Sequence, residues 1–105
     1  MNYWLDLFTV KTLDEFQKAG ARVSGFRDRR LTICEQIQPG DKLLCYVTGI
    51  SRWVGVLRVT QPAYRSEERI WDMEVFPIRL GVEPEIIAPA FWNSSSVFTV
   101  NRSSQ

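Results

Sequence analysis

Aromatic and branched residues occupy most of positions 3–10, a pattern that predicts a first β-strand. Asp6 interrupts this run. Side chains alternate between the two faces of a strand, so Asp6 shares a face with Trp4 and Phe8. A carboxylate on an otherwise aromatic face is uncommon, which makes Asp6 a candidate for a functional role.

Two short helices are expected next. Residues 12–15 have the Thr-x-x-Glu spacing of a capping box, with Thr12 as the N-cap, and Gly20 ends the helix that begins there. Residues 23–30 are rich in polar and charged side chains, which is typical of a loop or of the start of a helix. Apolar residues at three-residue spacing predict a second helix over residues 31–37.

The second half of the chain is predicted to form strands. After a Pro-Gly-Asp turn, the apolar run 42–48 and the alternating run 53–59 form a hairpin. A polar connection leads to residues 75–82, where alternate side chains form one buried face, and residues 85–87 add a short strand. Pro77 indicates that the strand over 75–82 lies at an edge or bends.

This order of elements predicts a small α+β domain, a curled and mainly antiparallel β-barrel with two or three short helices. A barrel protects the edges of so small a sheet. We expect the domain to cover residues 1–89. Residues 90–105 are rich in Ser and Asn and contain no acidic residue, and we expect them to form a tail with at most a short closing strand.

Composition narrows the classes of function. The 105 residues fit one domain, and 45% hydrophobic residues are too many for a disordered chain. The formal net charge is +1, so any affinity for nucleic acid depends on a local basic patch. Most of the 13 basic residues are arginines. Arginine binds phosphates and base edges in a bidentate manner, although a bias in composition explains the excess equally well.

The chain has no histidine, which excludes Ser-His-Asp and Cys-His catalysis and removes the commonest nitrogen ligand of zinc. Cys34 and Cys45 lie in apolar runs and are expected to be buried free thiols; a disulfide between them is the alternative. Free thiols favour a reducing compartment. The first ten residues match neither a signal peptide nor a membrane span, so we expect a soluble, cytoplasmic protein.

Four stretches together resemble the EVE domain, a member of the PUA-like barrel superfamily that is related to the YTH domain. They are the opening YWL, the run SGFRDRR, the run from PGDKLLCYV to WVGVLRVTQPAY, and the run IWDMEVFPIRLGVEP. The resemblance covers roughly residues 3–87. It implies a PUA-like barrel that binds one flipped-out and often modified base at its mouth, without catalysis. EVE domains occur commonly in prokaryotes.

The resemblance also implies a base pocket with a cationic rim. Trp71 matches an aromatic wall of the related cage, and Phe8 and Thr9 match the strand end where relatives contact the base edge. Asp6 would accept a hydrogen bond from an exocyclic amine. The residues expected in the pocket are Trp71, Phe8, Thr9, Asp6, Ser24, Phe26, Ser51 and Trp53, and those expected to contact phosphates are Arg27, Arg29, Arg30 and Arg52.

Each of these residues also has a purely structural interpretation. Trp71 and Phe8 would fill the core, Thr9 would begin a helix, and Asp6 would pair with an arginine. The charged run 27–30 would form the solvated face of a helix.

Two features of the predicted pocket depart from the family pattern. Many relatives have Trp where this chain has Ser24, so either Phe26 replaces that wall or Ser24 contacts the base itself. The turn before Trp53 is short in this chain. Alternation along the strand assigns Trp53 mainly to the core, and Ser51 and Arg52 to the rim of the pocket.

The expected partner is DNA or RNA that carries a modified base. A small-molecule sensor or a protein-interaction module with the same pocket is the alternative, and a nucleoside amidohydrolase is less favoured, because the sequence places no base beside a Ser or Cys nucleophile and contains no metal-ligand cluster. No cofactor is expected. The last residues do not match the family's closing segment, and an open sheet edge near Phe91 and Trp92 favours a homodimer.

Overall fold

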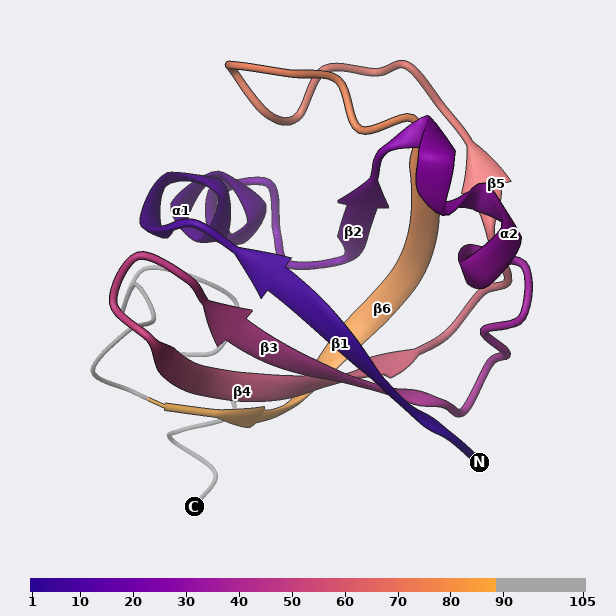
Figure 1. Ribbon diagram of the computed structural model, residues 1–105, viewed down its shortest axis with the longest axis horizontal. Helices are drawn as coiled ribbons and strands as arrows, with labels where there is room; N and C mark the ends of the chain where they lie inside the picture. Colours follow the sequence, from indigo (N-terminus) through magenta and orange to yellow (C-terminus); the bar gives the residue numbers. More distant parts are fainter. Residues whose placement is uncertain (89–105) are drawn as a thin grey trace.

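The computed structural model describes residues 1–88, which form one curled sheet with short helices (Figure 1). The elements are β1 (Tyr3–Phe8), α1 (Val10–Lys18), β2 (Val23–Phe26), the 3-10 helix η1 (Asp28–Arg30), α2 (Leu31–Cys34), β3 (Lys42–Val47), β4 (Arg52–Val59), β5 (Tyr64–Arg65) and β6 (Ile78–Ile87). The predicted tail, with Phe91 and Trp92, lies outside the described residues. No helix within residues 1–88 is long and apolar enough to cross a membrane.

The strands follow the order β1-β3-β4-β6-β2, and β5 pairs with β6 beside this path. β1 and β3 are parallel, and the other described pairings are antiparallel. The two terminal strands of this order, β1 and β2, are brought back towards each other by the curl of the sheet (Figure 1). The domain is therefore a half-barrel of the α+β class, mainly antiparallel as expected.

Helix α1 begins three residues earlier than its sequence predicts. Thr9, and not Thr12, is the N-cap: the Thr9 hydroxyl accepts from the amide of Thr12 at 3.0 Å, and the Thr12 hydroxyl accepts from the amide of Thr9 at 2.8 Å. β1 ends at Phe8, which forms the last pair of β1 with β3, opposite Val47. The chain is therefore free to turn at Thr9. The predicted end is confirmed, because Gly20 adopts a φ of +102° and Ala21 donates to the carbonyl of Phe16.

Residues 23–30 are expected from their sequence to form a loop or the start of a helix, and their first half forms neither. Residues 23–26 form β2 because they pair with β6, with Ser24 opposite Leu80. This long-range pairing overrides the weak local signal. The second half does lead into helical turns, η1 and then α2, although α2 is shorter than the predicted 31–37.

A β-bulge changes the side of the sheet on which Trp53 lies. Cys45 pairs with Gly55, but the next residue of β3, Tyr46, pairs with Trp53, so Val54 is the extra residue of β4. Beyond the bulge the alternation is reversed: Val54 is fully buried and Trp53 is 60% exposed. The prediction that Trp53 belongs to the core is therefore wrong, because a bulge cannot be seen in the local alternation.

The Pro-Gly-Asp run that contributes to the family resemblance has a structural explanation. Gly40 adopts a φ of +95°, which turns the chain into β3. Asp41 accepts hydrogen bonds from the indole Nε1 of Trp4 at 2.9 Å and from the amides of Asn2 and Gln38. The aspartate therefore fastens the start of β1 to the turn before β3.

The core lies between the inner face of the sheet and α1. Its members are apolar side chains from β1, α1, β3, β4, β6 and two connections: Phe8, Leu13, Phe16, Ala21, Ile37, Leu43, Cys45, Val47, Val54, Leu57, Val59, Leu80 and Val82. Both cysteines are buried free thiols, as predicted. Residues 85–87 continue β6 beyond a second bulge rather than forming a separate strand.

Candidate functional site

A buried carboxyl–hydroxyl pair joins the two ends of the curled sheet. Asp6 of β1 points to the inner face and is 2% exposed, and the hydroxyl of Ser24, in β2, donates to its Oδ2 at 2.5 Å. Within the described residues β1 pairs only with β3, and β2 only with β6. This side-chain contact therefore spans the gap between two free strand edges, which we call the seam.

Burial raises the pKa of the Asp6 carboxyl from 3.8 to about 7, and the hydrogen bond from Ser24 acts in the opposite direction. The charged form is disfavoured because the group is removed from water. Asp6 also faces the thiols of Cys34, in α2, and Cys45, in β3; burial first, and the neighbouring Asp6 second, raise the pKa of both thiols. The inner side of the seam is thus a poorly solvated place with a carboxyl group that titrates near neutral pH.

Trp71 lies on the other face of β2. Its ring packs against Gly25, where a Cβ atom would stand only 2.6 Å from two ring carbons. The ring meets Phe76 edge-on at 5.3 Å between centroids, and the guanidinium of Arg79 lies 5.6 Å from its centroid. Trp71 is 2% exposed, so in this conformation its ring is covered.

The segment 66–77, which carries Trp71, is held by hydrogen bonds to two other elements, β6 and α1. Arg79, buried in β6, donates to the carbonyls of Phe76 and Glu68 and to the hydroxyl of Ser66. The amide of Asp72 donates to Glu15 of α1 at 3.0 Å. These bonds set the position of the ring over β2.

Two of the four arginines predicted to contact phosphates, Arg27 and Arg29, lie where carboxylates also gather. Arg27 binds Glu74 through two hydrogen bonds, at 2.7 and 3.1 Å, and Arg65 binds Asp28 at 2.5 Å. This ion pair lowers the pKa of the Glu74 carboxyl and raises the pKa of the Arg27 guanidinium. A cavity of about 450 Å³ is bordered by charged residues of both signs and two apolar ones: Arg27, Asp28, Arg29, Arg65, Glu67, Glu74, Val75 and Pro77.

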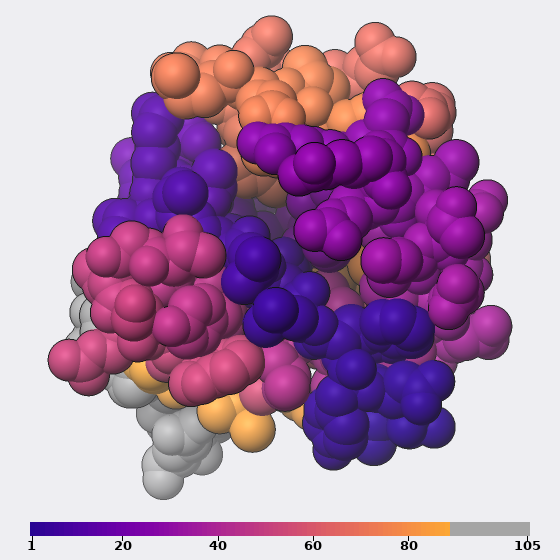
Figure 2. Space-filling model, viewed as in Figure 1, coloured from indigo at the N-terminus to yellow at the C-terminus, as the bar shows by residue number. Residues whose placement is uncertain are grey.

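Figure 2 shows that the surface is hollowed near the seam. The hollow is bordered by the indigo atoms of β1 and α1, by the purple atoms of η1 and α2, and by the orange atoms of the segment before β6. These are the elements that carry Asp6, Arg29 and Arg30, and Trp71. A ligand could approach the seam from this side.

The structure divides the predicted pocket residues among several places. Asp6 and Ser24 meet at the seam, and Phe26, two residues further along the same face of β2, packs beside the core. Trp71 is separated from that pair by the thickness of β2. Phe8 is a core residue whose ring lies 5.3 Å from that of Phe16.

The remaining predicted residues serve other elements. Thr9 caps α1. Ser51, with a φ of +52°, ends the turn between β3 and β4, and the exposed Arg52 is the first residue of β4. Trp53 is on the outer face of the sheet, the face opposite Asp6. The alternative that Asp6 pairs with an arginine is wrong, because its partner is Ser24.

Three residues of this region were not singled out from the sequence. Gly25 admits the Trp71 ring, and Phe76 and Arg79 support it. Phe76 and Arg79 belong to the FPIR run quoted for the resemblance, which was the available signal. The expectation that no hydroxyl has a base beside it is also wrong, since Ser24 contacts Asp6. No metal-ligand cluster of His, Cys, Asp or Glu occurs in residues 1–88.

Neither protein-family models nor curated proteins match the sequence. Solved structures do match the fold. The YTH domain of Pho92, solved in complex with m6A, has a TM-score of 0.65 and 12% identity over 81% of this chain and 56% of that one. The YTH domain of Zygosaccharomyces rouxii MRB1, in complex with N6-methyladenosine RNA, has a TM-score of 0.56 and 15% identity over 79% and 58%.

A hypothetical protein from Leishmania major matches with a TM-score of 0.60 and 15% identity, over 95% of this chain and 73% of that one. Of the two YTH domains, by contrast, the chain spans only 56% and 58%, which is less than two thirds of either length. At these identities the likeness concerns the fold alone, and the chain has a YTH-like fold.

Proposed function

We propose that the chain is a nucleic-acid-binding module of the EVE type, with a PUA-like barrel, and that it accepts one flipped-out, modified base at the seam between β1 and β2. The observation that carries this proposal is the buried Asp6–Ser24 pair between two free strand edges. A base edge offers hydrogen-bond donors and acceptors, and free backbone groups and a carboxyl group are suitable partners for both. The two YTH domains of similar fold were solved with methylated adenine, which supports a ligand of this class.

Aromatic walls are available on both faces of β2. Phe26 lies on the face of Ser24, and Trp71 lies on the face of Gly25. The Trp71 ring is covered by its contacts with Phe76 and Arg79, so stacking a base on it requires segment 66–77 to move. Stacking on an aromatic ring contributes about 1–3 kcal/mol per base, which helps to offset the cost of unstacking the base and of this movement.

The flanking phosphates of DNA or RNA would bind the arginines of the run 27–30. Arg29 and Arg30 are exposed, whereas Arg27 shares its guanidinium with Glu74. A phosphate would compete with this carboxylate, so we expect binding to be weakened by salt. Arg52 begins β4 beside Trp53 and is not part of the proposed rim.

We propose that the module binds without catalysis. Ser24 and Asp6 have the elements of a nucleophile and a base, but both are almost wholly buried, and the sequence has no histidine. The thiols of Cys34 and Cys45 have raised pKa values and remain protonated, which makes them poor nucleophiles. Oligonucleotides should therefore keep their mass during incubation with the protein, as measured by mass spectrometry.

The proposal is tested by titrating the protein with labelled oligonucleotides at two salt concentrations. The set contains single and double strands with unmodified bases, N6-methyladenine, 5-methylcytosine or 5-hydroxymethylcytosine. We expect one modified base to bind about tenfold more tightly than its unmodified counterpart, which corresponds to about 1.4 kcal/mol. Equal binding of all bases would overturn the proposal and favour a small-molecule or protein ligand for the site.

Two variants examine the site and one serves as a control. Trp71→Ala and Asp6→Asn should each reduce the ratio of affinities for modified and unmodified bases. Trp53→Ala removes a ring of the same kind from the outer face and should leave this ratio unchanged. The same loss in all three variants would mean that the preference does not arise at the seam.

A further inference from the structure

The outer face of the sheet is apolar across four strands. Strand pairing aligns Leu5, Leu44, Val56 and Ile86 in one row, from β1 through β3 and β4 to the end of β6. A second row consists of Leu7, Tyr46 and Trp53. These seven side chains, which we call the outer patch, lie on the face opposite the core and the seam.

The outer patch is largely open to solvent. Leu5, Leu7, Trp53 and Ile86 are each more than half exposed, and so is Tyr3 beside them. With about 200 Å² for a large side chain, five such residues expose on the order of 500 Å² of apolar surface. This is comparable to the largest apolar patch of a typical monomer, about 300–600 Å², and such patches are often sites of contact with another molecule.

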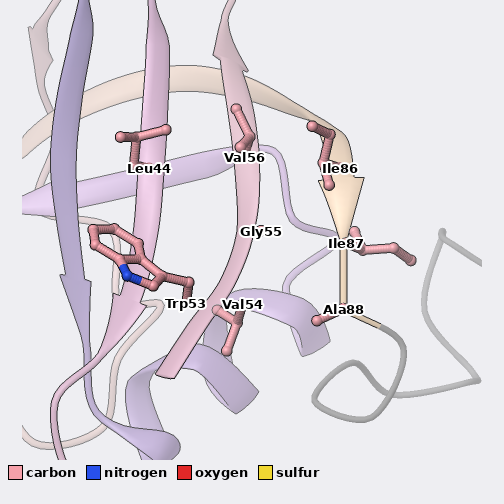
Figure 3. Close-up of a pocket in the computed structure, with 8 residues that line it drawn as sticks. All are labelled: Leu44, Trp53, Val54, Gly55, Val56, Ile86, Ile87 and Ala88. Atoms are coloured by element: carbon pink, nitrogen blue, oxygen red, sulfur yellow. The ribbon is translucent and has the colours of Figure 1, made fainter. Parts of the chain in front are cut away.

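The patch is grooved rather than flat. The Trp53 ring lies over β3 (Figure 3). It meets the ring of Tyr46 at 4.9 Å between centroids. A groove of about 370 Å³ runs from Trp53 over Gly55 to the end of β6. Ile86 and Trp53 flank it from opposite sides (Figure 3). A projecting ring beside a hollow is a shape that two copies related by a two-fold axis can fill for each other.

The charges beside the patch favour a protein partner over nucleic acid. Lys42 binds Glu85, and Arg58 binds Glu83, in the row that borders the patch. These pairs leave a polar border of nearly balanced charge. Such a border does not repel its own copy, and it lacks the excess of cations that phosphates would require.

We propose that the outer patch is a homodimer interface, in which two copies pack sheet against sheet around a two-fold axis. The exposed patch together with its polar border approaches the roughly 800 Å² that each partner of a standard interface buries. The inner face and the seam stay open in this arrangement, so the inference does not depend on the proposed function. It also differs from a dimer through the C-terminal edge, which the sequence had suggested.

The test is the mass of the full chain in solution, by size-exclusion chromatography with light scattering and by sedimentation equilibrium. The expected mass is twice 12.2 kDa. The double variant Leu5→Lys with Ile86→Lys puts charge at both ends of the first row and should raise the dissociation constant of the dimer at least about tenfold. Ile33→Lys, an exposed position of α2 outside the patch, is the matched control and should remain dimeric.

Circular dichroism verifies that each variant is folded, and if the double variant is not, the single variant Leu7→Lys in the second row provides the same test. A wild-type mass of 12.2 kDa at all protein concentrations would overturn the proposal, and another occupant of the patch would then have to be sought. A dimer that persists in the folded patch variants would also overturn it, because the interface would then lie elsewhere.

Discussion

The buried carboxyl of Asp6 makes a specific prediction about pH. Its pKa is raised from 3.8 to about 7, because burial disfavours the charged form. Below pH 3.8 the group is protonated in the folded and the unfolded chain alike. As the pH rises, the unfolded chain loses this proton first, so the contribution of Asp6 to stability falls until the pH passes about 7.

The size of the effect follows from the shift. About three pKa units at 1.36 kcal/mol each give a loss of about 4 kcal/mol between pH 4 and pH 7, or up to about 1.4 kcal/mol for each pH unit. Asp6→Asn cannot ionise, and its amide oxygen can still accept from Ser24. The free energy of unfolding of the wild type, minus that of Asp6→Asn, should therefore fall by about this amount over the same range.

The assay is urea denaturation of both proteins at a series of pH values. Taking the difference between them cancels the contributions of the other carboxylates, such as Glu74, whose pKa is lowered and whose effect on stability has the opposite sign. Ile50→Ala is the control, because it changes an exposed side chain without removing an ionisable group, and its difference in stability from the wild type should not vary with pH. A difference between wild type and Asp6→Asn that does not change with pH would refute the reasoning.

Two further predictions concern the packing around the site. Gly25→Ala places a Cβ atom 2.6 Å from the Trp71 ring, so it should lower the free energy of unfolding by about 1–3 kcal/mol. It should also alter the near-ultraviolet circular dichroism of the tryptophans. An unchanged spectrum and an unchanged stability would mean that the ring moves aside freely. Burial raises the pKa of the Cys34 thiol to about 11 and that of Cys45 well above its usual value, so neither should react with a thiol reagent at pH 8 until the protein unfolds; rapid reaction in the folded state would contradict this.

The features that sequence predicts well are those that depend on neighbours along the chain. The glycine that ends α1 and the Pro-Gly-Asp turn before β3 follow from the backbone freedom of glycine at positive φ. The hairpin of β3 and β4 follows from two apolar runs with a short turn between them. The inward direction of Asp6 follows from the two-residue repeat of a regular strand.

The predictions from sequence are wrong where a residue far away in the sequence determines the local structure. β2 exists because β6 pairs with it, and α1 begins at Thr9 because pairing with β3 ends at Phe8. The outward position of Trp53 results from a bulge that is defined only by the register against β3. Each of these features depends on contacts that are far apart in the sequence, and no local pattern records them.

The features of the candidate site can likewise be separated into those that the sequence determines and those that depend on long-range contacts. Sequence alone determined that the chain has no histidine, that Asp6 lies on the inner face of its strand, and that arginines cluster in residues 27–30. Only the tertiary structure decided that Ser24 is the partner of Asp6, that Trp71 packs on the opposite face of β2, and that Arg27 is bound to Glu74. The physical reason is that side-chain identity and alternation belong to single strands, whereas the meeting of β1 with β2 depends on how the whole sheet curls.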